Sequence, residues 1–307
     1  MISYYQKTIT TRKLKTVNEF KIGSWVFVED PSEEELNYLS ETLKLDRGLL
    51  SDAVDPFEVP RVETDSGTVY IFTRFPYEEG TEIATAPVLV GIAPEFVFTV
   101  SRKKLSLFER IIDGRVNINT TQKIRLLITI LSEVGAVYAR VITLINKDVR
   151  RTMGRLGDDI ANRDIVRFVS LESVLNDLLD ALVPTNTALQ NLLSGKLLKL
   201  FDEDKDFVDD VFLANGQLIE LARTNLRTIM NIRNAYSTIM TNTLNRVIKL
   251  LTGLTIVLTV PTIVVNLYGM NVPLPFQDSP HAFWIIMTMT AGATALAVWY
   301  FNRRKWL

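Results

Sequence analysis

The stretch Leu250–Tyr268, LLTGLTIVLTVPTIVVNLY, decides the fold, together with a second uncharged stretch, Ala282–Asn302, AFWIIMTMTAGATALAVWYFN. The first lies within a run of 28 residues, 250–277, that contains no Asp, Glu, Lys or Arg. About 20 mostly apolar residues in a helix cross the hydrocarbon core of a bilayer. The competing interpretation, two buried helices of a soluble core, is disfavoured because uncharged runs of this length are rare there. The sequence therefore predicts a transmembrane hairpin.

Charges around the hairpin predict its orientation. Arg246 and Lys249 precede the first stretch, and the basic tail 303–307 follows the second. The connecting loop, 269–281, contains neither Lys nor Arg. Because Lys and Arg favour the cytoplasmic side, we expect a multi-pass protein of the cell (inner or plasma) membrane. Both termini would lie in the cytoplasm and the short loop outside.

Composition narrows the function classes. The chain carries 34 Lys and Arg against 35 Asp and Glu, so it lacks the basic excess of a nucleic-acid-binding protein. It has no Cys and a single His, His281, which excludes thiolate chemistry and a His-rich metal cage within one chain. The sequence contains no phosphate loop, nucleophile elbow or dinucleotide fingerprint. It therefore favours a membrane protein that is not an enzyme.

Residues 1–118 predict an α/β cytoplasmic domain. Ser32 and Glu35 have the spacing of a capping box, in which each side chain accepts a hydrogen bond from the other residue's backbone N–H. The other expected elements are a strand at 25–30, hairpins that turn at 65–67 and 93–94, and a short helix at 106–113.

Long helices are expected from about residue 120, because Gly and Pro become sparse there. We expect helices at about 121–156 and 163–194, and a third that starts near Asp202 and meets no proline before Pro261. That helix would be nearly 100 Å long and must pack against others, with copies of itself as the expected partners. The expected organisation is an α/β domain (1–118), long cytoplasmic helices (119–200), a stalk helix continuing into the first transmembrane helix (201–268), an extracellular loop (269–281), a second transmembrane helix (282–302) and a basic cytoplasmic tail (303–307).

A polar stripe follows one face of the third helix, because residues taken in alternating steps of four and three stay on one narrow face. One interpretation is that the Thr hydroxyls bond their own helix or a neighbouring helix. The other is that the stripe lines a water-filled pore, which requires a symmetric oligomer because one helix cannot enclose it. Nine of the ten residues are Asn or Thr: Asn234, Thr238, Thr241, Asn245, Ile248, Thr252, Thr255, Thr259, Thr262 and Asn266.

The stripe offers neutral oxygen atoms and no carboxylate. Mg²⁺ usually keeps several of its waters in proteins, and amide and hydroxyl oxygens accept hydrogen bonds from such waters. A ring of charged side chains would hold a divalent ion more strongly and slow its release. A membrane potential of about 100 mV favours entry of a divalent cation by roughly 4.6 kcal/mol, so passive uptake needs no ATP site.

The sequence Tyr268-Gly269-Met270-Asn271 follows the stripe and lies between the two uncharged stretches. With the second stretch and the terminal Arg-Arg-Lys-Trp-Leu, it resembles the CorA family of divalent-cation (Mg²⁺/Co²⁺) channels. The resemblance extends along the order of α/β domain, long helices and hairpin. It implies a funnel-shaped homopentamer whose first transmembrane helix lines the pore, with Mg²⁺ as the transported and regulatory ion.

The resemblance also assigns roles to single residues. Asn271 would form the ring at the outer mouth that holds hydrated Mg²⁺, next to Met270. Gly269 would permit the turn that aims this ring, through its freedom in φ. Leu251 matches the hydrophobic constriction of the family, although the stripe places Thr252 at that level. The other positions that match the family's pore are Asn245, Thr259, Thr262 and Asn266, of which Thr259 and Asn266 make this pore more polar than usual.

Asp52 and Asp210 match the family's cytoplasmic Mg²⁺ sensor, which lies between subunits. Without Mg²⁺ the two carboxylates would repel each other and loosen the closed state. The alternative for Asp210 is a favourable interaction with the dipole of its own helix. Asp278 is the single acid of the loop and is either a cation-attracting or a solvated residue. The acidic residues that crowd the start of the third helix are Asp202, Glu203, Asp204, Asp206, Asp209 and Asp210.

Two other functions stay open. A transporter of the same fold could carry Zn²⁺, Co²⁺ or Ni²⁺, although Met270 and the absence of softer ligands in the stripe favour Mg²⁺. A membrane-anchored sensor or scaffold without a pore is the expected function if the Thr hydroxyls serve only to bond their own helix.

Overall fold

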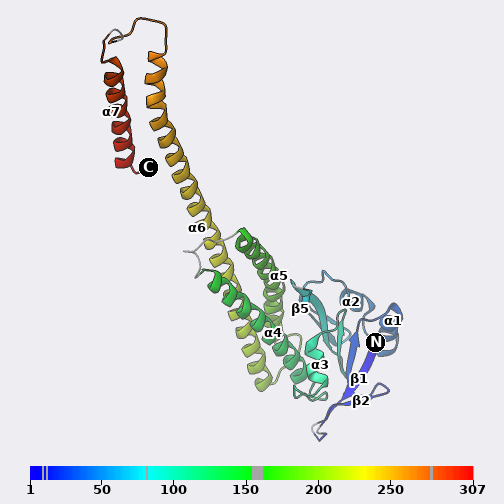
Figure 1. Ribbon diagram of the computed structural model, residues 1–307. Coiled ribbons are helices and arrows are strands. Elements are labelled where there is room, and N and C mark those ends of the chain that lie inside the picture. Colours follow the sequence, from blue (N-terminus) through cyan, green and yellow to red (C-terminus); the bar gives the residue numbers. More distant parts are fainter. Residues whose placement is uncertain (9, 12, 81, 154–161, 277–278, 307) are drawn as a thin grey trace. The chain divides into compact units, whose positions relative to one another are not determined.

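A computed structural model describes residues 1–306 except 9, 12, 81, 154–161 and 277–278 (Figure 1). Met1–Asn231 form one compact unit and Ile232–Leu307 form a second. The first contains a β-sheet with its covering helices, and the second contains a helical hairpin. Helix α6, Asp202–Tyr268, has 67 residues and contributes to both units.

A seven-stranded sheet forms the centre of the first unit. Its order is β2-β1-β3-β7-β6-β5-β4, and each pair of neighbours is antiparallel except β3 and β7, which are parallel. The strands are β1 (Ile2–Gln6), β2 (Lys15–Val17), β3 (Trp25–Glu29), β4 (Arg61–Asp65), β5 (Thr68–Glu79), β6 (Glu82–Ile92) and β7 (Val97–Ser101).

Helices α1 (Glu33–Leu43) and α2 (Arg47–Asp52) cover one face of this sheet. Leu39 and Leu50 from these helices belong to the same buried cluster as Tyr70 and Phe98 from the strands. Complete burial of such side chains stabilises the unit by about 1.5–3 kcal/mol each.

The expected capping box starts α1. The Glu35 N–H donates to the Ser32 hydroxyl at 3.2 Å, and the Ser32 N–H donates to the Glu35 carboxylate at 3.1 Å. This pair of hydrogen bonds satisfies two N–H groups that have no partner within the helix, so the prediction is confirmed.

Both expected hairpins are present. In the turn between β4 and β5, Ser66 and Gly67 have φ of 47° and 81°, the left-handed values that a two-residue hairpin requires. In the β6–β7 pair, Gly91 lies directly opposite Phe98. A Cβ atom on Gly91 would overlap the Phe98 ring, so the missing side chain provides the space that this ring fills.

The other face of the sheet is covered by α3 (Ser106–Ile112), α4 (Lys123–Met153) and α5 (Asn162–Leu193). The ring of Phe108 in α3 lies 5.1 Å from the ring of Phe27. The Tyr138 hydroxyl in α4 donates to the Arg74 carbonyl oxygen of β5 at 3.0 Å. These contacts fix the long helices to the sheet.

The N-terminal half of α6 packs in the same unit. Its buried Asn215 amide donates to the Leu182 carbonyl oxygen at 3.0 Å and to the Asn186 side-chain oxygen at 3.2 Å. Both partners belong to α5, so α4, α5 and this half of α6 form a helical layer beside the sheet.

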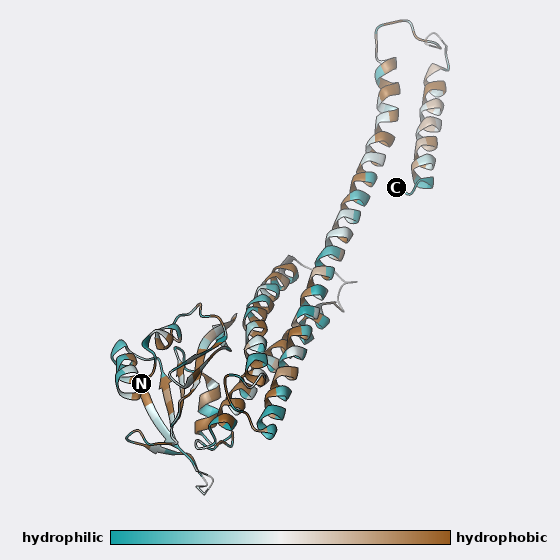
Figure 2. Cartoon of the chain, turned by 180° about the vertical axis from the view of Figure 1, so that it is seen from behind, coloured by the Kyte–Doolittle hydropathy of each residue, from teal (hydrophilic) through white to brown (hydrophobic). Residues whose placement is uncertain are grey.

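In the second unit, α7 (Ala282–Arg303) runs antiparallel beside the C-terminal half of α6 (Figure 1). Helix α6 continues through Pro261 without a break. Much of both helices has the brown colour of hydrophobic residues in Figure 2, and many of their apolar side chains are exposed, such as Leu258 and Leu296 at 60% and 68%.

Three helices in the described part of the chain are long and apolar enough to cross a membrane: α4, α6 and α7. In α4, 39% of the apolar window is buried inside the protein, against 6% in α6 and none in α7. Because α4 packs on the sheet, its apolar side chains have a partner within the chain. The two stretches chosen from the sequence are the ones left without a protein core to cover them.

The predicted strand at 25–30 and helix at 106–113 are confirmed as β3 and α3. The three long helices are confirmed as well, while residues 154–156 of the first lie outside the described residues. Strands β1 and β2 and helix α2 were not predicted. All three are short, and β1 and β2 form the sheet end beyond β3.

Candidate functional site

The polar stripe lies on a free face of α6 in the second unit. Every residue of the stripe is exposed in the single chain, as is Leu251. Gly253 is buried, and Val257 and Val264 are half-buried. At about 100° per residue, these three lie on the side of α6 opposite the stripe. The stripe therefore lies opposite the least exposed side of this part of α6.

Most threonines of the stripe share one hydrogen-bond geometry. In five of the six, the hydroxyl donates to the backbone carbonyl oxygen four residues earlier, at 2.6–3.0 Å. This is the internal bonding considered as one of the two interpretations, and it satisfies the donor in an apolar environment. The hydroxyl oxygen keeps its acceptor capacity, so the two interpretations are compatible. The threonines with this bond are Thr238, Thr241, Thr255, Thr259 and Thr262.

The hydrophobic constriction expected from the resemblance involves two neighbouring residues, Leu251 and Thr252. Leu251 is 62% exposed, and Thr252 next to it is exposed too. Ile248, one turn earlier on the stripe, is 51% exposed. Ile248 and Leu251 thus present apolar side chains at the level of Thr252.

The signature residues 269–271 follow the end of α6. The Gly269 N–H still donates to the carbonyl oxygens of Val265 and Asn266, at 3.0 and 3.2 Å. Gly269 lies in a turn directly after the last residue of α6 and is not among the described glycines with positive φ. The helical hydrogen bonds end the helix, and Asn271 is exposed just beyond them.

Further contacts shape this loop. The Tyr268 hydroxyl donates to the Pro275 carbonyl oxygen at 3.2 Å, which closes the chain over the signature. Met270 is 52% exposed. Asp278 lies outside the described residues. This hydrogen bond of Tyr268 was not predicted from the sequence, in which Tyr268 was only the first residue of the signature.

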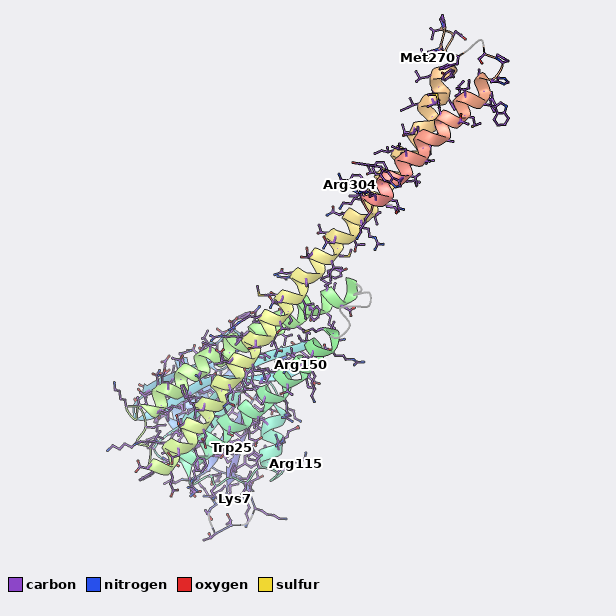
Figure 3. All side chains as sticks on the ribbon, turned by 90° about the vertical axis from the view of Figure 1, so that its left-hand side faces the viewer. Lys7, Trp25, Arg115, Arg150, Met270 and Arg304 are labelled. Atoms are coloured by element: carbon purple, nitrogen blue, oxygen red, sulfur yellow. The ribbon has the colours of Figure 1, made fainter. Side chains whose placement is uncertain are left out.

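Basic residues lie at the other end of the hairpin. Figure 3 shows Met270 at the connecting loop and Arg304 at the opposite end of α7. The Arg303 and Arg304 guanidinium groups lie over the rings of Trp299 and Tyr300, at 5.4 and 5.8 Å. Aromatic and basic side chains together are typical of a membrane–water interface.

The two acidic residues of the expected sensor lie on different elements of the first unit. Asp52 ends α2 and forms an ion pair with Arg61 at 2.7 Å. Arg61 also pairs with Glu58 and Glu63, and its guanidinium lies 4.3 Å from the centre of the Phe72 ring. The ion pair between Asp52 and Arg61 was not predicted from the sequence. Asp210 lies on α6 and is exposed.

The acidic group at the start of α6 is partly neutralised within the chain. Glu203 pairs with Arg125 at 2.7 Å, and Asp202 pairs with Lys205 at 3.4 Å. Asp204 is buried, 3.9 Å from Arg125. Among the described residues, no group of three or more Asp, Glu or His side chains could hold a metal ion within one chain.

Comparison with known proteins gives a consistent result. Residues 21–304 match the family described as CorA-like Mg²⁺ transporter protein. The cobalt/magnesium transport protein CorA of Methanocaldococcus jannaschii is 25% identical over 296 residues, which is 92% of this chain and 91% of that protein. The magnesium transport protein CorA of Helicobacter pylori is 22% identical over 98% of both chains.

Solved structures agree on the fold. The complete structure of the CorA magnesium transporter from Methanocaldococcus jannaschii has a TM-score of 0.88 to this chain at 21% identity, and the match covers 100% of this chain and 99% of that one. Membership of a membrane transporter family also accounts for two apolar helices without a protein core to cover them. The chain belongs to the CorA-like Mg²⁺ transporter family.

Proposed function

We propose that the protein is a passive, potential-driven channel for Mg²⁺, with Co²⁺ as a second cargo, formed by a homopentamer in which α6 lines the pore. The observation that carries this proposal is the exposed stripe of neutral oxygen atoms on the side of α6 opposite the buried Gly253. A relative named as a cobalt/magnesium transport protein supports both cargoes. The large first unit and both termini would lie in the cytoplasm, because the basic residues lie at one end of the hairpin.

A metal-panel flux assay tests this function. The purified protein is reconstituted into liposomes, and entry of Mg²⁺, Co²⁺, Ni²⁺ and Zn²⁺ is followed with internal indicators under an inside-negative potential. We expect Mg²⁺ and Co²⁺ to enter and to compete with each other. Zn²⁺ entry without Mg²⁺ entry would favour a zinc transporter of the same fold, and an intact oligomer that passes no metal would favour a membrane-anchored sensor.

Replacing Thr259 by Val is expected to reduce Mg²⁺ flux severalfold. Val has nearly the shape of Thr but lacks the outward oxygen that would accept a hydrogen bond from the water shell of the ion. Thr288→Val is the matched control, because Thr288 in α7 is exposed and its hydroxyl also donates four residues back, to Trp284 at 2.8 Å. Equal flux in both variants would contradict a pore-lining position for Thr259.

We further propose that cytoplasmic Mg²⁺ closes the channel by binding between Asp52 of one subunit and Asp210 of the next. Both carboxylates belong to the first unit, and in the single chain Asp210 is exposed and Asp52 is partly exposed. Two facing carboxylates repel each other until a cation lies between them. Binding of Mg²⁺ would therefore favour the closed arrangement over the open one.

The double variant Asp52→Asn, Asp210→Asn is expected to need at least about tenfold more internal Mg²⁺ for half-maximal inhibition, a loss of about 1.4 kcal/mol of binding free energy. Asn keeps the size of Asp and removes the charge. Asp202→Asn, at the start of the same helix, serves as the control and should leave inhibition unchanged. Flux is measured at a series of internal Mg²⁺ concentrations. An unchanged inhibition curve in the double variant would rule these residues out as the sensor.

A further inference from the structure

A cavity of about 530 Å³ lies in the first unit between α4, α5, α6 and strand β5. Its floor consists of buried apolar side chains, among them Leu131, Leu182 and Leu189. Its mouth is formed by exposed residues of α4 and α6, such as Ala136 and Ala214. A concave, mostly apolar site of this size is suited to bury an apolar group.

The buried polar side chains that line this cavity already have partners within the chain. The Tyr138 hydroxyl donates to the Arg74 carbonyl oxygen, and burial raises the pKa of Tyr138, so this hydroxyl stays protonated. The Thr185 hydroxyl donates to the Ala181 carbonyl oxygen at 2.8 Å. An apolar occupant therefore leaves these hydrogen bonds intact. The one charged residue of the lining is Asp210, which is exposed.

An unpartnered aromatic side chain lies elsewhere in the same unit. Phe57 is 85% exposed, in the segment between α2 and β4. The segment is held by short-range hydrogen bonds: the Phe57 N–H donates to the Asp55 carboxylate at 2.9 Å, and the Glu58 N–H donates to the Asp55 carbonyl oxygen at 3.1 Å. Phe57 is thus presented to solvent on an ordered turn, five residues after Asp52.

We propose that the cavity of each subunit receives Phe57 of a neighbouring subunit. This inference rests on the proposed sensor, in which Asp52 of one subunit faces Asp210 of the next. Asp210 lines the cavity, and five residues of chain span at most about 17 Å. An approach of the two carboxylates therefore puts Phe57 within reach of the cavity mouth, and the cavity supplies the apolar surface that Phe57 lacks in its own chain.

The contact has a clear energetic role. The carboxylates of Asp52 and Asp210 repel each other in the absence of Mg²⁺, whereas burial of an aromatic ring is attractive with or without the metal. Docking of Phe57 holds the two sensor carboxylates near each other, so that Mg²⁺ binds a nearly formed site. Loss of this burial is expected to weaken the response to Mg²⁺ about tenfold or more.

Cross-linking tests the contact directly, because the chain contains no native Cys. The pair Phe57→Cys, Ala214→Cys in the full-length oligomer, treated with a short bismaleimide, is expected to give covalent multimers on a denaturing gel. Ile22→Cys with Ala214→Cys is the control, because Ile22 is an apolar residue with 68% exposure outside the proposed contact. Multimers from the first pair and none from the control support the docking.

The pair Asp52→Cys, Asp210→Cys separates this inference from the sensor itself. Multimers from that pair without multimers from the Phe57 pair overturn the docking and leave the sensor standing. Absence of multimers from both pairs overturns both, since the docking depends on the same subunit contact.

Filling the cavity provides a second test that does not depend on cross-linking. A Cβ atom on Gly135 in α4 meets no atom within 4 Å, so Gly135→Phe is expected to fold and to occupy the cavity from inside. Gly135→Phe and Phe57→Ala should each raise the Mg²⁺ concentration that protects the protein from limited proteolysis by about tenfold. The combined variant should show no further increase. If the single variants are protected at the same Mg²⁺ concentration as the wild type, the docking is overturned. If Mg²⁺ does not protect even the wild-type protein from proteolysis, the sensor is overturned as well.

Discussion

Replacing Asn271 by Ala is expected to reduce Mg²⁺ flux through the reconstituted protein by at least about a hundredfold. Asn271 is exposed immediately beyond the last helical hydrogen bonds of α6. In a symmetric oligomer each subunit contributes one such amide, so a single substitution removes a whole ring of acceptors. A hydrogen bond to a charged partner is worth about 1.5–3 kcal/mol, and the loss of several leaves the hydrated ion without a partner at the mouth. Flux is read from an Mg²⁺ indicator inside liposomes under an inside-negative potential.

Two further variants make this result specific. Asn302→Ala is the matched control, because Asn302 is an exposed Asn at the basic end of α7, and its flux should equal that of the wild type. Asn271→Asp should retain Mg²⁺ binding but release the ion more slowly, because a ring of carboxylates binds a divalent cation more strongly. Wild-type flux in an intact Asn271→Ala oligomer would remove Asn271 from the ion pathway.

Replacing Gly91 by Ala is expected to destabilise the first unit by about 3 kcal/mol or more. The added methyl group would overlap the ring of Phe98, which lies directly across the β6–β7 pair and is completely buried. That ring cannot move aside freely, because it packs against Tyr70 and Phe96 with ring centres 5.6 and 5.9 Å away. Thermal unfolding of the detergent-solubilised protein, or its resistance to protease, measures the loss.

Replacing a different glycine, Gly216, by Ala is not expected to reduce the stability of the protein. A Cβ atom on Gly216 in the interior of α6 meets no atom within 4 Å, so Gly216→Ala should be neutral or stabilising by up to about 1 kcal/mol. Shortening the opposing side chain in the double variant Gly91→Ala, Phe98→Leu should restore part of the stability lost in Gly91→Ala. Equal stability of the Gly91→Ala variant and the wild type would show that the strand pair adapts without cost.

The sequence was most informative where one physical constraint dominates. The absence of charge over 250–277 and the sparse Gly and Pro before it predicted a helix that runs from Asp202 into the apolar stretch. The turn at Ser66 and Gly67 was predicted because few residues tolerate the required φ. The stripe on α6 followed from helix periodicity alone, and its place along the ion pathway stays a prediction.

Other features depend on contacts that a local pattern does not contain. Strands β1 and β2 have only five and three residues, and they are held by pairing with β3 and with each other. The ion pair between Arg61 and Asp52 joins residues of a strand and a helix. The sensor pairing of Asp52 with Asp210 remains a proposal because it requires a second subunit.

The hydroxyl geometry of the stripe has a consequence for anions. Because the hydroxyl hydrogens of Thr255, Thr259 and Thr262 are directed at backbone carbonyl oxygens, these side chains present only the negative ends of their dipoles outward. A chloride or phosphate ion at this depth finds no hydroxyl donor to replace its lost water, whereas a cation finds acceptors. In the proposed pore, the threonine section of α6 would therefore discriminate by the sign of the charge without carrying any charge of its own.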